Sequence, residues 1–390
     1  MEYKYNSNML TQLRNIVPLF NDLFDKITFE TIESMIPHSV MKNAENIIIT
    51  GCGDSYCAAI ASKPAFRGVH VETPRNIEAA RYYNTFKNWD KEKMTKTIVC
   101  AISVSGGPVR PRETLLRFKE VGATVLAFTD HPESPLGQVA QYCINMNVPS
   151  FPFSPLTIPY MASQYAVIMF GLTLSYVNGS ITKEQAANER ESIINYINMF
   201  DDSIIEEIDF RTFSIAEKWL SCGVDQYDYI GDDQEYSTSF FGSAKLVESS
   251  GELTTIDDPE DWNHINFFNA KPATTATLVV ANEDSPSFSR SLEAISTASI
   301  LGRPVLVVTD SADAKFPEGS EIFRLPKPAY RWCNAMLEHL PLDFIAAYIG
   351  LLLGRVPFRQ DTINQNEDPA IQKNPHIYGR FKNSKLEIVL

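Results

Sequence analysis

Residues 121–130 read Val-Gly-Ala-Thr-Val-Leu-Ala-Phe-Thr-Asp, and residues 301–310 read Leu-Gly-Arg-Pro-Val-Leu-Val-Val-Thr-Asp. The pattern Gly-x-x-Val-Leu-x-x-Thr-Asp thus recurs after 180 positions. The same offset relates Gly51 to Gly231, Ser105 to Ser285, Arg110 to Arg290 and Glu113 to Glu293. A repeat of this length indicates a duplicated domain rather than a solenoid unit. We therefore expect the function to lie where the two copies differ.

The composition is that of an ordinary globular protein with two domains. The chain has 390 residues, of which 44% are hydrophobic and 21% charged. Its net charge of −14 argues against a nucleic-acid partner, because nucleic-acid-binding proteins present a basic face. An anionic substrate must then be captured by local groups.

Neither end of the chain nor its apolar runs indicate a membrane or an export route. The start, Met-Glu-Tyr-Lys-Tyr, does not resemble a signal peptide, and no apolar run reaches the ~20 residues of a membrane span. The 6 cysteines are scattered, which favours reduced thiols over a disulfide framework. We expect a cytoplasmic protein with no membrane partner.

Short apolar runs alternate with helical patterns in both halves, which predicts an α/β fold. Strands are expected at residues 46–50, 97–103, 124–128 and 142–146, and again at 227–231, 277–281, 305–309 and 321–325. Strands that are apolar throughout are typical of parallel sheets with helices on both faces, as in flavodoxin-like folds. The predicted parts are N-terminal helices (1–36), a first domain (37–182), linker helices (183–220), a second domain (221–358) and a C-terminal tail laid over the site (359–390).

Two loops of the first copy carry the chemistry of an anion site. They are Gly51-Cys-Gly-Asp-Ser55 and Ser103-Val-Ser-Gly-Gly107, each after a predicted strand. Glycines let the backbone approach an anion, serines donate hydrogen bonds, and a helix N-terminus adds amide groups. The alternative is a pair of tight strand–helix turns with capping serines. Neither loop is a P-loop, and the third glycine of the dinucleotide fingerprint is missing.

The second copy has acidic loops in these places, Gly231-Asp-Asp-Gln-Glu235 and Asn282-Glu-Asp-Ser285, which would repel a phosphate. It adds Lys245 and Glu248, three residues apart on one face of a predicted helix, and His264 between aromatic residues. A solvated salt bridge and a structural histidine are the alternatives for these residues. No cluster has zinc-ligand spacing, and we expect neither a metal nor an organic cofactor.

Together these segments resemble the sugar isomerase (SIS) domain family, in particular the two-domain isomerase portion of glucosamine-6-phosphate synthases, over residues 40 to 390. The resemblance implies that the phosphate or the sugar of a sugar phosphate is bound by Gly53, Asp54, Ser55, Ser103, Ser105, Gly106 and Lys245. It implies that Glu248, in Lys245-Leu-Val-Glu248, moves a proton between C1 and C2. The family's ring-opening histidine lies sixteen residues further, at His264, and its C-terminal lysine corresponds to Lys385, with Lys382 as the alternative.

The sequence departs from the family pattern at several positions. Asp54 replaces a threonine, where a carboxylate suits an amine or a sugar hydroxyl better than a phosphate. Gly107-Pro108 interrupts the second loop, and Arg110 and Arg112 follow either as phosphate contacts or as surface charges. No glutamine-hydrolysing domain precedes the repeat, so ammonia from glutamine is not expected as the nitrogen source.

The expected function is a deaminase or deglycase that acts on an amino-sugar or fructosamine 6-phosphate through an enolamine. A phosphosugar isomerase without amine release and a non-catalytic sugar-phosphate sensor are the alternatives. The small-molecule sugar phosphate is the expected partner. We also expect a homodimer, with His264 reaching the neighbouring subunit's site as the family resemblance implies.

Overall fold

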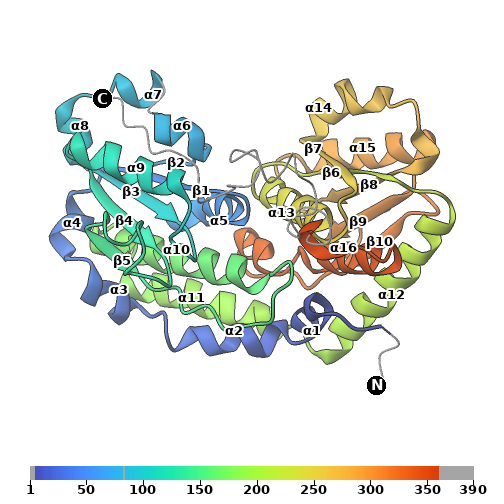
Figure 1. The fold of residues 1–390 in the computed structure, drawn as a ribbon, viewed down its shortest axis with the longest axis horizontal. Coiled ribbons are helices and arrows are strands. Elements are labelled where there is room, and N and C mark those ends of the chain that lie inside the picture. Colours follow the sequence, from blue (N-terminus) through green and yellow to red (C-terminus); the bar gives the residue numbers. More distant parts are fainter. Residues whose placement is uncertain (1–4, 82–83, 360–390) are drawn as a thin grey trace, which may run out of the picture. The chain divides into compact units, whose positions relative to one another are not determined.

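The computed structural model describes residues 5–81 and 84–359, which form two compact units. The first-sheet unit comprises Leu19–Ser150 and Ile158–Glu191. The second-sheet unit comprises the described residues of 5–18, 151–157 and 192–359. Figure 1 shows that each unit is built around its own sheet.

The first sheet has five parallel strands in the order β2-β1-β3-β4-β5. Its strands are β1 (Asn46–Gly51), β2 (His70–Glu72), β3 (Thr97–Ile102), β4 (Thr124–Phe128) and β5 (Tyr142–Ile144). The helices of this unit are α3 (Phe29–Met35), α4 (His38–Asn43), α5 (Asp54–Ser62), α6 (Asn76–Arg81), α7 (Asn84–Lys87), α8 (Lys91–Thr95), α9 (Val109–Glu120) and α10 (Ile158–Val177).

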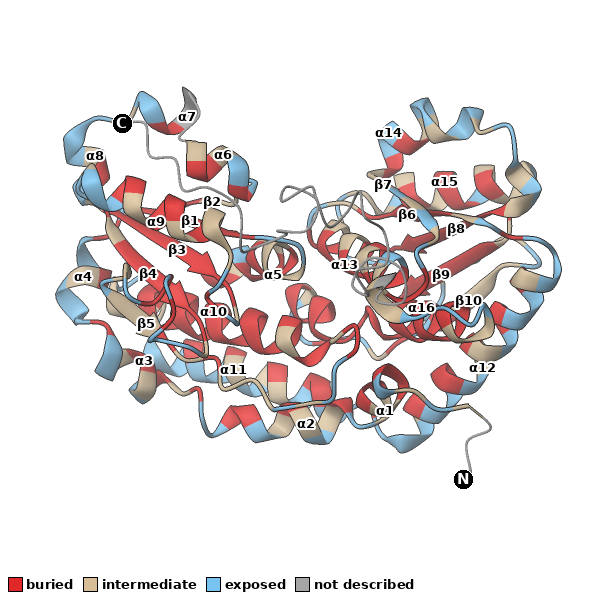
Figure 2. Cartoon of the chain, viewed as in Figure 1, coloured by how far each residue is buried: buried red, intermediate tan, exposed pale blue. Residues whose placement is uncertain are grey.

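Successive residues of a strand point to opposite faces, and both faces of this sheet are covered. Val99 and Ala101 pack in one cluster with Leu115 and Phe118 of α9. On the other face, the ring of Phe128 contacts Phe170 of α10. Figure 2 accordingly shows the central strands buried. Burial on both faces explains why these strands are apolar throughout.

The second sheet repeats this topology, in the order β10-β9-β8-β6-β7. Its strands are β6 (Gln226–Ile230), β7 (Leu253–Asp257), β8 (Thr275–Val280), β9 (Val305–Thr309) and β10 (Glu321–Arg324). The helices of this unit are α1 (Asn8–Arg14), α12 (Asp202–Ser221), α13 (Gln234–Ser250), α14 (Pro259–His264), α15 (Phe288–Ile300) and α16 (Leu340–Leu352). Helices α2 (Ile16–Phe24) and α11 (Lys183–Asn198) contain residues of both units. Short 3-10 helices lie at Lys63–Ala65, Asn266–Phe268, Pro272–Thr274, Arg331–Met336 and Pro357–Arg359.

The predicted α/β fold with two parallel, helix-covered sheets is confirmed, and both sheets have the flavodoxin-like strand order 2-1-3-4-5. The edge strands β2 and β7 were not predicted. Strand β2 has only 3 residues, and β7 reads Leu-Thr-Thr-Ile-Asp, so neither forms an apolar run. Apart from Arg359, the predicted tail, with Lys382 and Lys385, lies outside the described residues.

The helical stretch Arg331–Leu352 is long and apolar enough to cross a membrane. Its most apolar window is 89% buried inside the structure, and α16 packs against α12 and α13. Its apolar character is therefore accounted for by the core of the second-sheet unit.

Candidate functional site

The two predicted anion-binding loops lie next to each other at the carboxyl edge of the first sheet. Strands β1 and β3 are neighbours, and Gly51 pairs with Ile102 at their ends. Residues 52–55 and 103–107 therefore leave the sheet side by side. Ligands bind outside this edge in open parallel sheets.

The first loop turns directly into α5. Gly53 precedes the helix with φ 56° and ψ −123°, a conformation that residues with a side chain rarely adopt. Asp54 and Ser55 lie in the first turn and are half-buried. Within the described chain, the hydroxyl of Ser55 has no hydrogen-bond partner, so it remains available to a ligand. The helix N-terminus adds a favourable dipole for an anion.

The second loop leaves several hydrogen-bond donors available. Ser103 is buried, yet its hydroxyl has no hydrogen-bond partner among the described residues. The amides of Val104 and Ser105 likewise have no acceptor in this part of the chain. Gly106 has φ 59°, and a Cβ there would lie 1.9 Å from Oγ of Ser134, so only glycine fits. Unsatisfied amides beside a left-handed residue form an anion-binding concavity.

In the second-sheet unit, Lys245 and Glu248 form the predicted pair on one face of α13. The ammonium Nζ of Lys245 lies 2.7 Å from Oε2 of Glu248. The Lys245 side chain is only 1% exposed and that of Glu248 26%, so the pair is not a fully solvated salt bridge. A buried ammonium thus fixes a carboxylate that still reaches solvent.

His264 ends α14 on the surface of the same unit, with 69% of its side chain exposed. Its Nε2 lies 2.9 Å from Oε1 of Glu260, and Arg290 also pairs with Glu260. The described contacts therefore place His264 with Glu260 rather than with Glu248. Lys385 lies outside the described residues.

An arginine that the sequence did not single out links the acidic loops at the carboxyl edge of the second sheet. Arg331 donates to Glu235 at 2.6 Å, to Asp233 at 3.3 Å and to the hydroxyl of Ser285 at 3.3 Å. Glu235 and Asp233 stand 180 positions after Ser55 and Gly53. The guanidinium of Arg331 thus lies where the first copy is predicted to bind a phosphate.

Two loop amides of this second edge are bonded to carboxylates. The amide of Asp233 donates to Oδ1 of Asp232 at 2.8 Å, and that of Glu283 donates to Oδ1 of Asp310 at 2.8 Å. Carboxylates of the chain thus accept hydrogen bonds from two amides that a phosphate would otherwise need, which agrees with the prediction that this edge is unsuited to a phosphate.

Glu338 lies beneath this edge and is fully buried. It accepts hydrogen bonds from the hydroxyl of Thr238 and, at 2.6 Å, from the side-chain amide Nδ2 of Asn282. Burial, with a smaller effect from the charge of Glu235, raises the pKa of Glu338 to about 8. Glu338 is thus a carboxylic acid that remains largely protonated at neutral pH.

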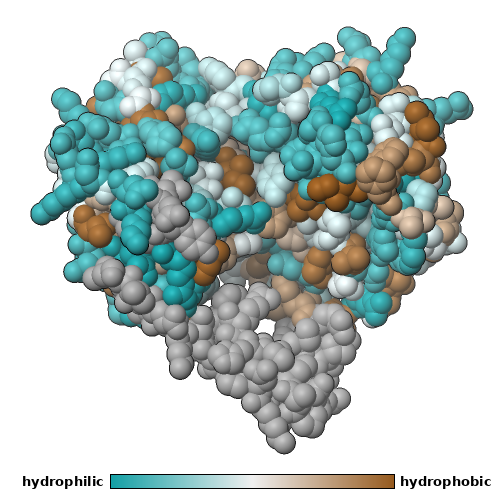
Figure 3. All heavy atoms as spheres, turned by 90° about the horizontal axis from the view of Figure 1, so that it is seen from above, coloured by the Kyte–Doolittle hydropathy of each residue, from teal (hydrophilic) through white to brown (hydrophobic). Residues whose placement is uncertain are grey.

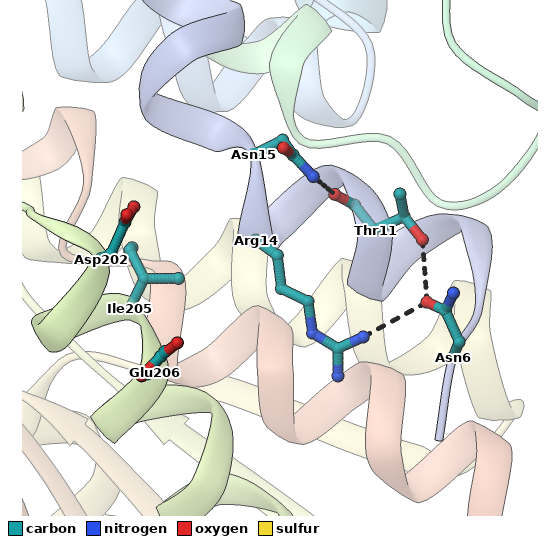
Figure 4. A pocket seen from close by; sticks show the side chains of 7 residues that line it. All are labelled: Asn6, Thr11, Arg14, Asn15, Asp202, Ile205 and Glu206. Carbon is teal, nitrogen blue, oxygen red and sulfur yellow. Dashed lines mark hydrogen bonds between the residues drawn. The ribbon is translucent and has the colours of Figure 1, made fainter. Parts of the chain in front are cut away.

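A separate hollow of about 320 Å³ lies between α1 and α12 (Figure 4). Arg14 lines it, and its Nε is 2.7 Å from Oδ2 of Asp209, so this charge is neutralised. Asp202 and Glu206 make the hollow acidic. It contains none of the predicted site residues, and we assign it no role.

The model of the SIS domain family matches residues 40–170. The glutamine–fructose-6-phosphate aminotransferase (isomerizing) of Thermotoga maritima is 25% identical over 224 residues, which cover 57% of this chain and 35% of that protein. The chain spans between about a third and a half of the length of the curated relatives it matches.

Two solved structures share the whole fold. One is the C-terminal domain of the glucosamine-fructose-6-phosphate aminotransferase from Francisella tularensis, with a TM-score of 0.79, 15% identity and coverage of 91% of this chain and 98% of that one. The other is the glucosamine-6-phosphate deaminase of Thermotoga maritima, with a TM-score of 0.64, 13% identity and coverage of 90% and 98%. Residues 40–170 therefore match the SIS domain family, and the chain as a whole shares the fold of these two solved structures.

Proposed function

We propose that this protein is an enzyme that moves a proton between C1 and C2 of an amino-sugar or fructosamine 6-phosphate and then releases the amine. The observation that carries the proposal is the half-buried carboxylate of Glu248, fixed at 2.7 Å by the buried ammonium of Lys245. A carboxylate in a partly dry site is a suitable general base for carbon acids.

The proposed roles divide between the two units. The donors of the 52–55 and 103–107 loops hold the phosphate, so that binding energy remote from the reacting carbons orients them. Glu248 takes the proton from one carbon of the open-chain sugar and returns it to the other. His264 opens the pyranose ring, and Lys385 steadies the carbonyl or imine.

The chemistry balances with water as the only further reactant. With glucosamine 6-phosphate, loss of the C2 proton gives an enolamine, and protonation at C1 gives an imine at C2. Water adds to the imine carbon and ammonia leaves, which yields fructose 6-phosphate. With a fructosamine 6-phosphate the proton moves from C1 to C2, and hydrolysis yields an aldose 6-phosphate and the free amine. Asp54, half-buried in the first turn of α5, is the proposed contact for the amine or a sugar hydroxyl.

The test is proton NMR in D₂O with glucosamine 6-phosphate and with a fructosamine 6-phosphate. We expect deuterium at C1 or C2 and a released amine, with the rate lowered by about 10² to 10⁴ in Glu248→Gln. Glu252→Gln, which removes a nearby carboxylate paired with Arg355, serves as the control. Exchange without amine release would identify an isomerase, and ligand binding without exchange would identify a sensor.

We further propose a cytoplasmic homodimer formed through the surface around His264. Leu253 on the edge strand β7 is 65% exposed, and Ile265 and Phe268 are 62% and 75% exposed. Figure 3, which shows the molecule from above, has hydrophobic areas among mostly hydrophilic residues. Sedimentation should show a dimer that Phe268→Glu dissociates, with loss of activity. A monomer with full activity would refute the proposed exchange of His264.

A further inference from the structure

A buried carboxylate in the first-sheet unit forms ion pairs with three arginines. Glu113, on α9, is fully buried. Nη1 of Arg110 pairs with its Oε2, and Arg81 and Arg117 lie 3.6 Å and 3.7 Å from its Oε1. Nε of Arg117 also donates to the carbonyl oxygen of Ala80 at 2.7 Å. One negative charge thus faces three positive charges.

Arg110 follows the second loop of the predicted phosphate site. It is the second residue of α9, which begins directly after the 103–107 loop and Pro108. The side chain is only 18% exposed, which excludes the reading of Arg110 as a solvated surface charge.

The second copy shows that the arginine–glutamate pair alone does not make a cationic site. Arg290 and Glu293 stand at the corresponding positions of α15 and are also ion-paired. There, Arg290 lies between two exposed carboxylates, Glu260 and Glu293. Among the described ion pairs, one arginine faces two carboxylates in the second copy, whereas three arginines face one carboxylate in the first.

We propose that Arg110 binds the phosphate group of the substrate and that Glu113 positions it. Serine hydroxyls and loop amides are neutral donors, and a chain of net charge −14 offers a phosphate dianion no general attraction. A guanidinium carries five donors in a planar fork, which suits the oxygens of a phosphate as it suits those of a carboxylate. Arg81 and Arg117 hold Glu113 and add positive potential. The identity of the ligand as a sugar phosphate rests on the proposed function.

Inorganic phosphate is the probe that tests the proposal without turnover. Titration calorimetry on the full chain should show that Arg110→Gln weakens phosphate binding about 10- to 100-fold, the usual effect of losing a charge-assisted bond. Arg290→Gln, the matched control, should bind as the wild type does. Equal binding by Arg110→Gln and the wild type, or no phosphate binding by the wild type, would overturn the proposal.

The positioning role of Glu113 needs a separate readout, because its removal also takes a carboxylate partner from Arg81 and Arg117. Glu113→Gln should raise KM for the sugar phosphate while kcat stays within about threefold, and Glu113→Asp should restore part of the affinity. Thermal unfolding shows whether Glu113→Gln folds. If it does not, Arg110→Lys replaces it, because lysine keeps the charge but lacks the planar donors, and its phosphate affinity should fall below that of the wild type. A fall in kcat alone would contradict the positioning role.

Failure of this proposal and failure of the proposed function are distinguishable. If phosphate binding depends on Arg110 but no carbon-bound proton exchanges, the catalytic proposal fails and the phosphate contact stands. If carbon-bound protons exchange and Arg110→Gln binds phosphate normally, the phosphate contact of Arg110 fails and the catalytic proposal stands.

Discussion

The carboxyl edges of the two sheets share one backbone and carry opposite chemistry. Gly53 (φ 56°, ψ −123°) and Asp233 (φ 52°, ψ −111°) adopt nearly the same conformation before α5 and α13. After them, the first copy presents serine and available amides, while the second presents Glu235 and its ion pair with Arg331. The two copies thus share the loop geometry, but in the second a guanidinium of the chain lies where the first is predicted to bind a phosphate.

The aspartates that follow the two repeated Val-Leu-x-x-Thr strands show the same divergence. The carboxylate of Asp130 accepts from the amides of Met146 and Val148, which lie outside the 103–107 loop. Asp310 instead accepts from the amide of Glu283, within the loop that follows β8. In the second copy, a carboxylate of the chain thus accepts from a loop amide. In the first copy, comparable loop amides have no acceptor among the described residues. This division predicts one phosphate site per chain.

The largest effect should come from breaking the internal ion pair of the second edge. Arg331→Met leaves the buried Glu235 without its cation and should lower the free energy of unfolding by about 3 to 5 kcal/mol. Adding Glu235→Gln should recover most of this loss. Lys327→Met, which removes exposed pairs with Glu283 and Asp284, should cost less than about 1 kcal/mol in the same denaturant titrations. Equal losses in the two single variants would show that the second edge is not held together in this way.

The next effect depends on pH and acts through Glu338. Because its folded pKa of about 8 exceeds the unfolded value of about 4.3, the folded state holds a proton that the unfolded state releases between these values. Its stabilising contribution is complete below about pH 4 and falls as the pH rises to 8, by up to about 1.4 kcal/mol per pH unit.

Glu338→Gln mimics the protonated acid and should flatten this part of the stability curve. Denaturant unfolding at several pH values measures the difference, with the exposed Glu283→Gln as control. Parallel curves for Glu338→Gln and the wild type would mean that Glu338 is ionised in the folded state.

The smallest effect concerns the shared backbone conformation. Gly53→Ala should destabilise the fold by about 1 to 3 kcal/mol through backbone strain alone, because a Cβ there has no atom within 4 Å. Asp233→Gly should stabilise it by roughly 1 kcal/mol, since strain is relieved and only an exposed ion pair is lost. If Asp233→Gly destabilises the protein, the pair with Arg331 outweighs the strain.

The fold was predictable because most strands are continuous apolar runs and the repeat assigns them to two copies of one domain. The loops 52–55 and 103–107 were also predictable, since each directly follows such a strand. Arg331 was not, because it contacts Glu235 from 96 positions away and belongs to no recognisable spacing. One signal could have pointed to Glu338: it is a carboxylate in a largely apolar helical stretch, which is stable only with buried partners.

The division of roles between the two units is tested most directly by calorimetric titration with glucosamine 6-phosphate. We expect one site per chain in the wild type and an affinity within about threefold of it in Glu248→Gln. The double variant Ser103→Ala with Ser105→Ala should bind at least about tenfold more weakly, since it loses hydrogen bonds to a charged group. Loss of binding in Glu248→Gln with normal binding in the double serine variant would contradict the account.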